Sequence, residues 1–130
     1  MSTGKLVHGL LSPDATIQGI LGNKIFPVQI PQKDAFPAMV YRHLSQDPTL
    51  LKDVKSPMDT VTMELTFYTK SYEDSMTLAG RCREILDFFT GTVNTVSVDK
   101  IRFLDQNDND LVEGYGFFVT QQTYTIRLIR

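Results

Sequence analysis

With 130 residues, 42% of them hydrophobic and 22% charged, the chain is expected to form one globular domain over residues 1–130. A net charge of −2 without a Lys/Arg cluster argues against tight binding to free nucleic acid or to an anionic membrane, and no apolar run approaches the roughly 20 residues of a membrane span. The single cysteine, Cys82, excludes a disulfide within the chain, so we expect a soluble protein of a reducing cytoplasm.

Two short helices are predicted at the N-terminus. Leucine and valine residues with i, i+4 spacing favour a helix over about Gly4–Leu11. Ser12-Pro13-Asp14 then supplies an N-cap serine, a proline for the first helical position and an early acid, so a second helix is expected to run from there to Gly22-Asn23. The next segment, Ile25–Pro37, holds three prolines and is expected to be extended and irregular, not a central strand.

Two strands joined by a long loop are predicted next. Ala38–Leu44 carries apolar residues on both of its alternating faces, as an inner strand covered on two sides does. Gln46–Pro57 has two prolines and mixed charge, and is expected to be a loop of the long kind that is usually functional or mobile. Thr60–Thr69 alternates strictly and completes a wide hairpin. Its buried face is expected to carry Val61, Met63, Leu65 and Phe67.

An amphipathic helix over roughly Tyr72–Thr90 is the element around which the chain is organised. Ser71 offers the N-cap hydroxyl, and Gly91 stands where a left-handed residue ends a helix. The apolar arc of this helix is about 180° wide, which is broader than packing on one sheet requires. The positions in the arc are Tyr72, Met76, Leu78, Ala79, Cys82, Ile85, Leu86 and Phe89.

Two residues depart from this helical pattern. Arg83 projects within the apolar arc, whereas Phe88 projects from the charged face. One interpretation is that Arg83 snorkels past the edge of the core and Phe88 tucks beneath a loop. The other is that the helix also faces a partner subunit, with both side chains in the contact.

Two further strands are predicted after the helix. Thr95–Leu104 alternates imperfectly, which suits a strand near an edge, and Asp105–Asp110 is a polar turn signal. Tyr115–Ile129 changes its apolar register across Gln121-Gln122, which predicts a bulge or a strand that leaves one sheet for another contact. The predicted fold is therefore α+β, with a mixed, mostly antiparallel sheet of about four to five strands packed against one long helix, and one or two short N-terminal helices.

The residue types of common active sites occur without the spacing that their chemistry needs. Asp105, Asn107 and Asn109 match the first positions of a calcium loop, but its glycine and closing glutamate are missing, so a hairpin tip is the better interpretation. His8 and His43 lie far apart and neither is near the cysteine, so zinc spacing is absent. We expect no enzyme activity, and no catalytic residue, metal or cofactor.

Three stretches resemble sequence features of one known family. Gly22–Pro27, after a helix, resembles its step of glycine, basic residue, isoleucine, aromatic residue and proline. Phe36–Tyr41 resembles its proline-led second strand, and Glu64–Thr69 with Ser71-Tyr72-Glu73 and Leu78-Ala79 resembles its strand-to-helix signature. The remainder of the chain fits in layout. These features are similar to those of the tail-completion, or tail-terminator, proteins of long-tailed bacteriophages.

This resemblance implies a structural virion protein. Proteins of the family form a ring at the head-proximal end of the tail tube, a hexamer in the assembled tail. A free subunit that is monomeric is compatible with such a ring, because the tail itself can template it. The ring stops tube polymerisation and presents a surface for head–tail joining. The implied partners are further copies of the chain, the tail tube protein and the head connector protein, with DNA passing through without specific binding and no membrane involved. The implied location is the host cytoplasm during assembly and then the virion tail.

The resemblance transfers no functional residues, so the interface is inferred from the chain itself. We expect subunit or tail contacts on the long helix and on the loop that follows the first hairpin strand, at Phe88, Arg83, Gln46, Asp47, Lys52, Asp53 and Lys55. Two alternative functions stay open: a head–tail connector or stopper component, and a cytoplasmic dimeric α+β module that binds a ligand or regulates. Rings or capped tubes in particle images would distinguish the first group from the dimeric module.

Overall fold

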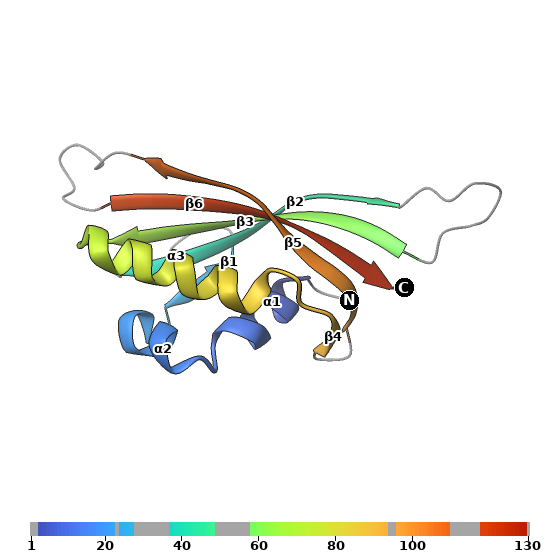
Figure 1. Cartoon of the computed structure of the whole chain (residues 1–130), viewed down its shortest axis with the longest axis horizontal. Helices are drawn as coiled ribbons and strands as arrows, with labels where there is room; N and C mark the ends of the chain where they lie inside the picture. The colour runs from blue at the N-terminus through green and yellow to red at the C-terminus, as the bar shows by residue number, and fades with distance from the viewer. Residues whose placement is uncertain are drawn as a thin grey trace.

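The computed structural model describes residues 3–22, 24–27, 37–48, 58–93, 96–109 and 118–129. These residues form one twisted sheet with its helices on a single face (Figure 1). The helices are α1 (Thr3–Leu11), α2 (Ala15–Leu21) and α3 (Tyr72–Leu86), and the strands are β1 (Ile25–Pro27), β2 (Ala38–Pro48), β3 (Met58–Thr69), β4 (Gly91–Val93), β5 (Val96–Asn109) and β6 (Phe118–Ile129).

Among the described residues, the strands are arranged in the order β1-β2-β3-β6-β5-β4, and the β1–β2 pair alone is parallel. The α+β class and the mostly antiparallel sheet agree with the sequence prediction. In the described part of the chain the sheet has six strands instead of four to five, because a three-residue strand lies at each edge. β1 ends at Pro27, which lacks a backbone donor and is therefore suited to an edge and not to a central strand.

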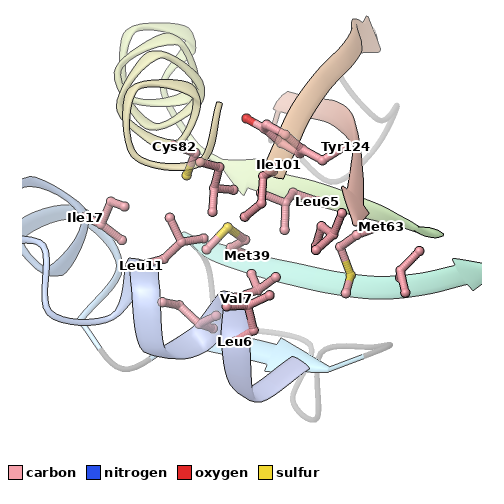
Figure 2. Close-up of a cluster of buried hydrophobic side chains, with 14 of the residues drawn as sticks. Leu6, Val7, Leu11, Ile17, Met39, Met63, Leu65, Cys82, Ile101 and Tyr124 are labelled. Atoms are coloured by element: carbon pink, nitrogen blue, oxygen red, sulfur yellow. The ribbon is translucent and has the colours of Figure 1, made fainter. Parts of the chain in front are cut away.

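The core fills the space between the sheet and the helices (Figure 2). The alternation in β3 is confirmed on this side, where four side chains are buried: Val61, Met63, Leu65 and Phe67. On the opposite row of β3, Thr66 is buried as well, although the pattern placed it nearer water. Removing these apolar side chains from water is the dominant favourable contribution to folding, at about 25 cal/mol per Å² of apolar surface.

The two N-terminal helices are present, and one cap differs from the prediction. The N-cap of α2 is Asp14, whose Oδ2 accepts a hydrogen bond from Ile17 N at 3.1 Å, so Ser12 is not the cap. α2 ends at Leu21 as expected, because Gly22 adopts a φ of 61°. None of the helices in the described ranges is long and apolar enough to span a membrane.

Helix α3 begins as predicted but ends earlier. Ser71 Oγ accepts from Asp74 N at 3.5 Å, which confirms the N-cap. The helix ends at Leu86, not Thr90, because Asp87 is extended and Phe88 enters the left-handed region at φ 68°.

The chain beyond α3 is held by β5 instead of by a helical turn. Phe88 N donates to Ile101 O at 2.7 Å, and Ile101 N donates to Phe89 O at 3.0 Å. Gly91, with φ 144°, begins β4 and does not cap the helix. Phe89 therefore leaves the predicted apolar arc, and Tyr72, at the other end of that arc, is exposed.

Strand β2 is longer than predicted. It continues to Pro48, with Gln46 opposite Val61, so the first residues of the predicted loop belong to the hairpin. The hairpin pairing of β2 with β3 is confirmed, and its register shifts once, between His43 and Ser45. The rest of the predicted loop lies outside the described residues.

Strand β5 also corrects a prediction. It runs to Asn109, so the predicted polar turn at Asp105–Asp110 is strand as far as Asn109. Its imperfect alternation comes from two register shifts that leave Asp99 and Leu104 outside the ladder. It lies next to the short edge strand β4, which agrees with a position near an edge.

Strand β6 lacks the bulge that was predicted at Gln121-Gln122. It pairs with β3 from Phe118 to Ile129 without a register shift. The apolar pattern changes because Thr120 and Gln122 are polar residues on the helix-facing row, and both are buried. A sequence pattern alone cannot distinguish a buried hydrogen-bonded side chain from an exposed one, so the change was misinterpreted as a change of face.

Candidate assembly surfaces

The first candidate surface lies where α3 ends beside β5. We name Arg83, Asp87, Phe88, Arg102 and Phe103 the arginine–aromatic cluster. Arg83 stacks over the Phe103 ring at 4.0 Å from its centroid, and Arg102 stacks over the Phe88 ring at 4.6 Å. Asp87 lies between the two stacks, with its carboxylate oxygens 3.8 Å from Arg83 Nε and 3.9 Å from Arg102 Nε. Asp87 also accepts from Phe103 N at 2.9 Å. One carboxylate therefore joins the helix end to the sheet.

Phe88 is the least favourable member of this cluster for stability. It is 60% exposed and adopts a left-handed backbone conformation. That conformation costs a residue other than glycine about 1–2 kcal/mol, and such strain is concentrated at functional sites. The exposed ring is not tucked beneath a loop. Arg83, by contrast, lies at the edge of the core over Phe103, as a snorkelling side chain does, so a subunit contact through Phe88 and Arg83 stays a prediction.

An open hollow of about 310 Å³ lies beside the cluster. Its lining residues are Gly80, Arg83, Glu84, Asp87 and Phe88. Glu84 is largely exposed at its rim, where its Oε2 is 2.8 Å from Arg81 Nη1. The hollow thus presents the Phe88 ring, the Arg83 guanidinium and the Glu84 carboxylate toward solvent, whereas the Asp87 carboxylate is largely buried.

The second candidate surface is residues 42–48 of β2, which we name the β2 edge. β1 pairs only with Met39, Val40 and Tyr41, so no other strand of the described residues covers this edge. Leu44 occupies the register shift and is 46% exposed. The sequence reasoning missed Leu44 because it placed the end of a regular strand there. A bulge re-aims one side chain, and only the pairing with β3 reveals it.

The residues predicted for the loop surface are divided. Gln46 lies on the β2 edge, but its Nε2 donates to Asp59 Oδ2 at 2.8 Å within the same subunit. Asp47 lies on the same edge, with its backbone opposite Thr60. Lys52, Asp53 and Lys55, the remaining members of that prediction, lie outside the described residues.

One row of the sheet connects the two candidate surfaces. Its ladder pairs are Gln46↔Val61, Val61↔Ile126 and Ile126↔Ile101, and Ile101 O accepts from Phe88 N. Gln46 and Phe88 therefore lie at the same level on opposite edges of the sheet. The structure brings Arg83 and Phe88 together, and it places the β2 edge on the far side of three intervening strands.

The sheet face opposite the helices carries a second hollow, of about 350 Å³. It is lined by Thr60, Asp99, Lys100, Arg102, Thr125 and Arg127. Arg127 Nη1 donates to Asp99 Oδ2 at 3.2 Å within the hollow, and Arg102 lies 3.9 Å from Asp87, so two of the three cations have an acidic partner.

The described part of the chain offers little for catalysis. It contains no group of three or more His, Cys, Asp or Glu residues that could hold a metal ion. Cys82 lies on the buried side of α3, and burial raises the pKa of its thiol far above neutral pH. Burial likewise raises the pKa of the Tyr124 hydroxyl, which donates to Gln122 Oε1 at 2.8 Å.

An α+β subunit with exposed surfaces on two opposite sheet edges has the features of a structural assembly protein. The sequence model of the family described as "Tail completion protein gp17" matches residues 5–128, so the chain belongs to the tail completion protein gp17 family. It is a structural protein of a bacteriophage tail, and this family is not an enzyme family.

The fold recurs in a solved particle. A chain of the "Virion of native gene transfer agent (GTA) particle" superposes with a TM-score of 0.73, covering 95% of this chain and 92% of that chain at 13% sequence identity. At that identity the likeness shows a shared fold alone. No curated protein sequence matches the chain.

Proposed function

We propose that the chain caps the head-proximal end of a phage tail tube as a ring, which ends tube polymerisation and allows the head to be joined. Membership of the tail completion family supports the tail role. The observation that carries the ring is the row that places Gln46 and Phe88 at one level on opposite edges. Different surfaces on opposite sides of a subunit make head-to-tail contacts, and such contacts close into rings when the rotation per subunit permits it.

The proposed partners follow from this position in the virion. They are further copies of the chain, six in the assembled ring as the family resemblance implies, together with the tail tube protein and the head connector protein. Subunits are monomeric before they reach the tail, because the tube end templates the ring. A net charge of −2 favours DNA that slides through the ring over DNA that is held by it. Residues 1–130 act as one domain, assembled in the host cytoplasm and retained in the virion tail.

Complementation of a phage that lacks the gene tests this function. Phe88→Asp should leave folding intact, since the ring is exposed, and should produce tails of irregular length that do not join heads. Tyr72→Asp is the matched control, because Tyr72 is an exposed aromatic residue at the opposite end of α3 and should support normal tails.

Three outcomes of the assay bear on the proposal. Folded Phe88→Asp protein that yields uniform, head-joined tails removes Phe88 from the interface. Wild-type protein that fails to restore capped tails contradicts the function itself. Labelled protein found on isolated heads and not on isolated tails would favour the connector or stopper alternative instead.

A further inference from the structure

We propose that neighbouring copies in the ring join the β2 edge of one subunit to the arginine–aromatic cluster of the next, with Leu44 seated against Phe88. This inference rests on the proposed function and specifies which surfaces meet. The occupant of each surface is a second copy of this chain.

The exposed apolar side chains support this pairing. Leu44 and Phe88 are among the most exposed large hydrophobic residues of the described chain, and they stand at opposite ends of nearly the same row. Phe88 is also held in an unfavourable backbone conformation, at φ 68°, by the hydrogen bond from its N–H to Ile101 O. A contact that covers both side chains would remove apolar surface from water at each end of the subunit.

The contact would bring one pair of opposite charges close together. Arg42 precedes Leu44 on the β2 edge, and Glu84, which is 69% exposed, lines the hollow beside Phe88. The carboxyl end of α3 adds a partial negative charge at the same place. The cluster as a whole is mixed in charge, because Glu84 is also paired with Arg81, and Arg83 and Arg102 are more exposed than Asp87. A single charge pair of this kind contributes to the orientation of a contact more than to its affinity.

The geometry favours a head-to-tail contact over a two-fold one. In a ring whose axis runs along the strands, every subunit presents its row at the same height, so the β2 edge of one copy meets the cluster of the next. A two-fold contact between two β2 edges would leave both clusters uncovered and would stop at a dimer. The bulge at Leu44 also interrupts the regular strand edge, which favours a short side-chain contact over an open-ended ladder.

Site-directed cross-linking tests the pairing directly. The natural thiol, Cys82, is buried, so introduced cysteines will react without background. The variant to test is Leu44→Cys/Phe88→Cys, bound to tails that were assembled without the wild-type protein. One sample is treated with an oxidant and a second with a short bis-maleimide. The bis-maleimide reaches across Cα distances beyond the roughly 7 Å limit of a disulfide. We expect a ladder of covalent oligomers that ends at the closed ring, whereas each single variant stays monomeric.

The matched control is Leu44→Cys/Thr125→Cys, which carries the same number of thiols but places one in the hollow on the open sheet face. It should give no ladder. Efficient dimers from Leu44→Cys alone would show a two-fold contact and overturn the proposal. Rings and capped tails without a Leu44–Phe88 ladder would overturn this pairing while leaving the function intact. If wild-type protein forms neither rings nor capped tails, the proposed function fails instead.

Discussion

The two ends of the contact between α3 and the sheet are built differently. Toward the C-terminus of the helix, Cys82 and Leu86 are buried in the apolar cluster that also contains Ile101. Toward its N-terminus, the contact contains buried hydroxyl and amide groups. Apolar packing is non-directional and provides most of the stability, whereas buried hydrogen bonds tolerate only one arrangement of their partners.

The polar end is a pair of hydrogen-bonded groups. Ser75 Oγ accepts from Thr69 Oγ1 at 3.1 Å and lies 3.2 Å from Thr120 Oγ1. One turn later, Gln122 Nε2 donates to Ala79 O at 2.9 Å. No buried side-chain nitrogen or oxygen in the described ranges lacks a partner. The comparison teaches that the apolar end holds α3 onto the sheet, and that the polar end sets its position along the strands.

The largest effect is expected at the apolar end. Leu86→Ala should lower the free energy of unfolding by about 2–5 kcal/mol, because the side chain is fully buried and leaves a cavity. Denaturant unfolding measures the loss, with the exposed Leu104→Ala as the control that should stay within about 0.5 kcal/mol of wild type. A loss below about 0.5 kcal/mol for Leu86→Ala would mean that this end does not carry the stability.

A smaller loss is expected at the polar end. Gln122→Ala leaves the Tyr124 hydroxyl without its hydrogen bond, whereas Ala79 O still accepts its helical bond, and one buried group left unsatisfied costs about 1–3 kcal/mol. Gln121→Ala, one residue away on the open face, is the matched control and should change stability little. Equal effects of the two variants would contradict a buried polar network at this end.

The side of α3 that faces away from the sheet should matter less than either end. Arg81 donates to Asp14 Oδ1 from Nη2 at 2.7 Å and from Nε at 2.9 Å. These hydrogen bonds lower the pKa of the Asp14 carboxyl from its usual 3.8. A carboxyl whose pKa is lower in the folded state stabilises the fold at pH values above 3.8. This stabilisation is lost as the pH falls through the folded-state pKa. Asp14→Asn keeps an N-cap but not the charge. The melting-temperature difference between wild type and this variant should be present at pH 7 and shrink toward zero in acid. A difference that grows on acidification would reverse the sign of this contribution.

The smallest stability effect is expected just beyond the apolar end. Phe88→Gly relieves the left-handed conformation but loses the stack with Arg102, and these opposing changes should leave the free energy of unfolding within about 0.5 kcal/mol of wild type. A loss of more than about 2 kcal/mol would place Phe88 in the apolar end of the helix contact and not on an assembly surface.

Much of the fold could be predicted because its signals are local. The alternation of Val61 through Phe67 and the cap at Ser71 depend on residues next to one another in sequence. The mistakes occurred where distant residues compete. The end of α3 was misplaced because Ile101 takes the hydrogen bonds of Phe88 and Phe89, and no local pattern near Phe88 shows that.

The candidate surfaces show the same division. Phe88 and Arg83 could be selected from the sequence because they interrupt a helical pattern, although Phe88 lies after the helix and not on it. Leu44 could not be selected, since its exposure depends on a bulge in the pairing of β2 with β3. Arg102 was missed because its stack on Phe88 joins residues of different elements.

By itself, the sequence determined the α+β class, the buried row of β3, the N-cap of α3 and the likeness to tail completion proteins, since periodicity, capping and family features are properties of neighbouring residues. Only the tertiary structure decided that Gln46 and Phe88 stand at one level on opposite edges of the sheet. Their relative position depends on the registers of three strand pairs, β2 with β3, β3 with β6 and β6 with β5. It also decided that Thr120 and Gln122 are buried, because their partners, Ser75 and Ala79, come from a helix that lies far away in sequence. Register and burial are set by which strands and helices meet, and a linear pattern contains no record of that choice.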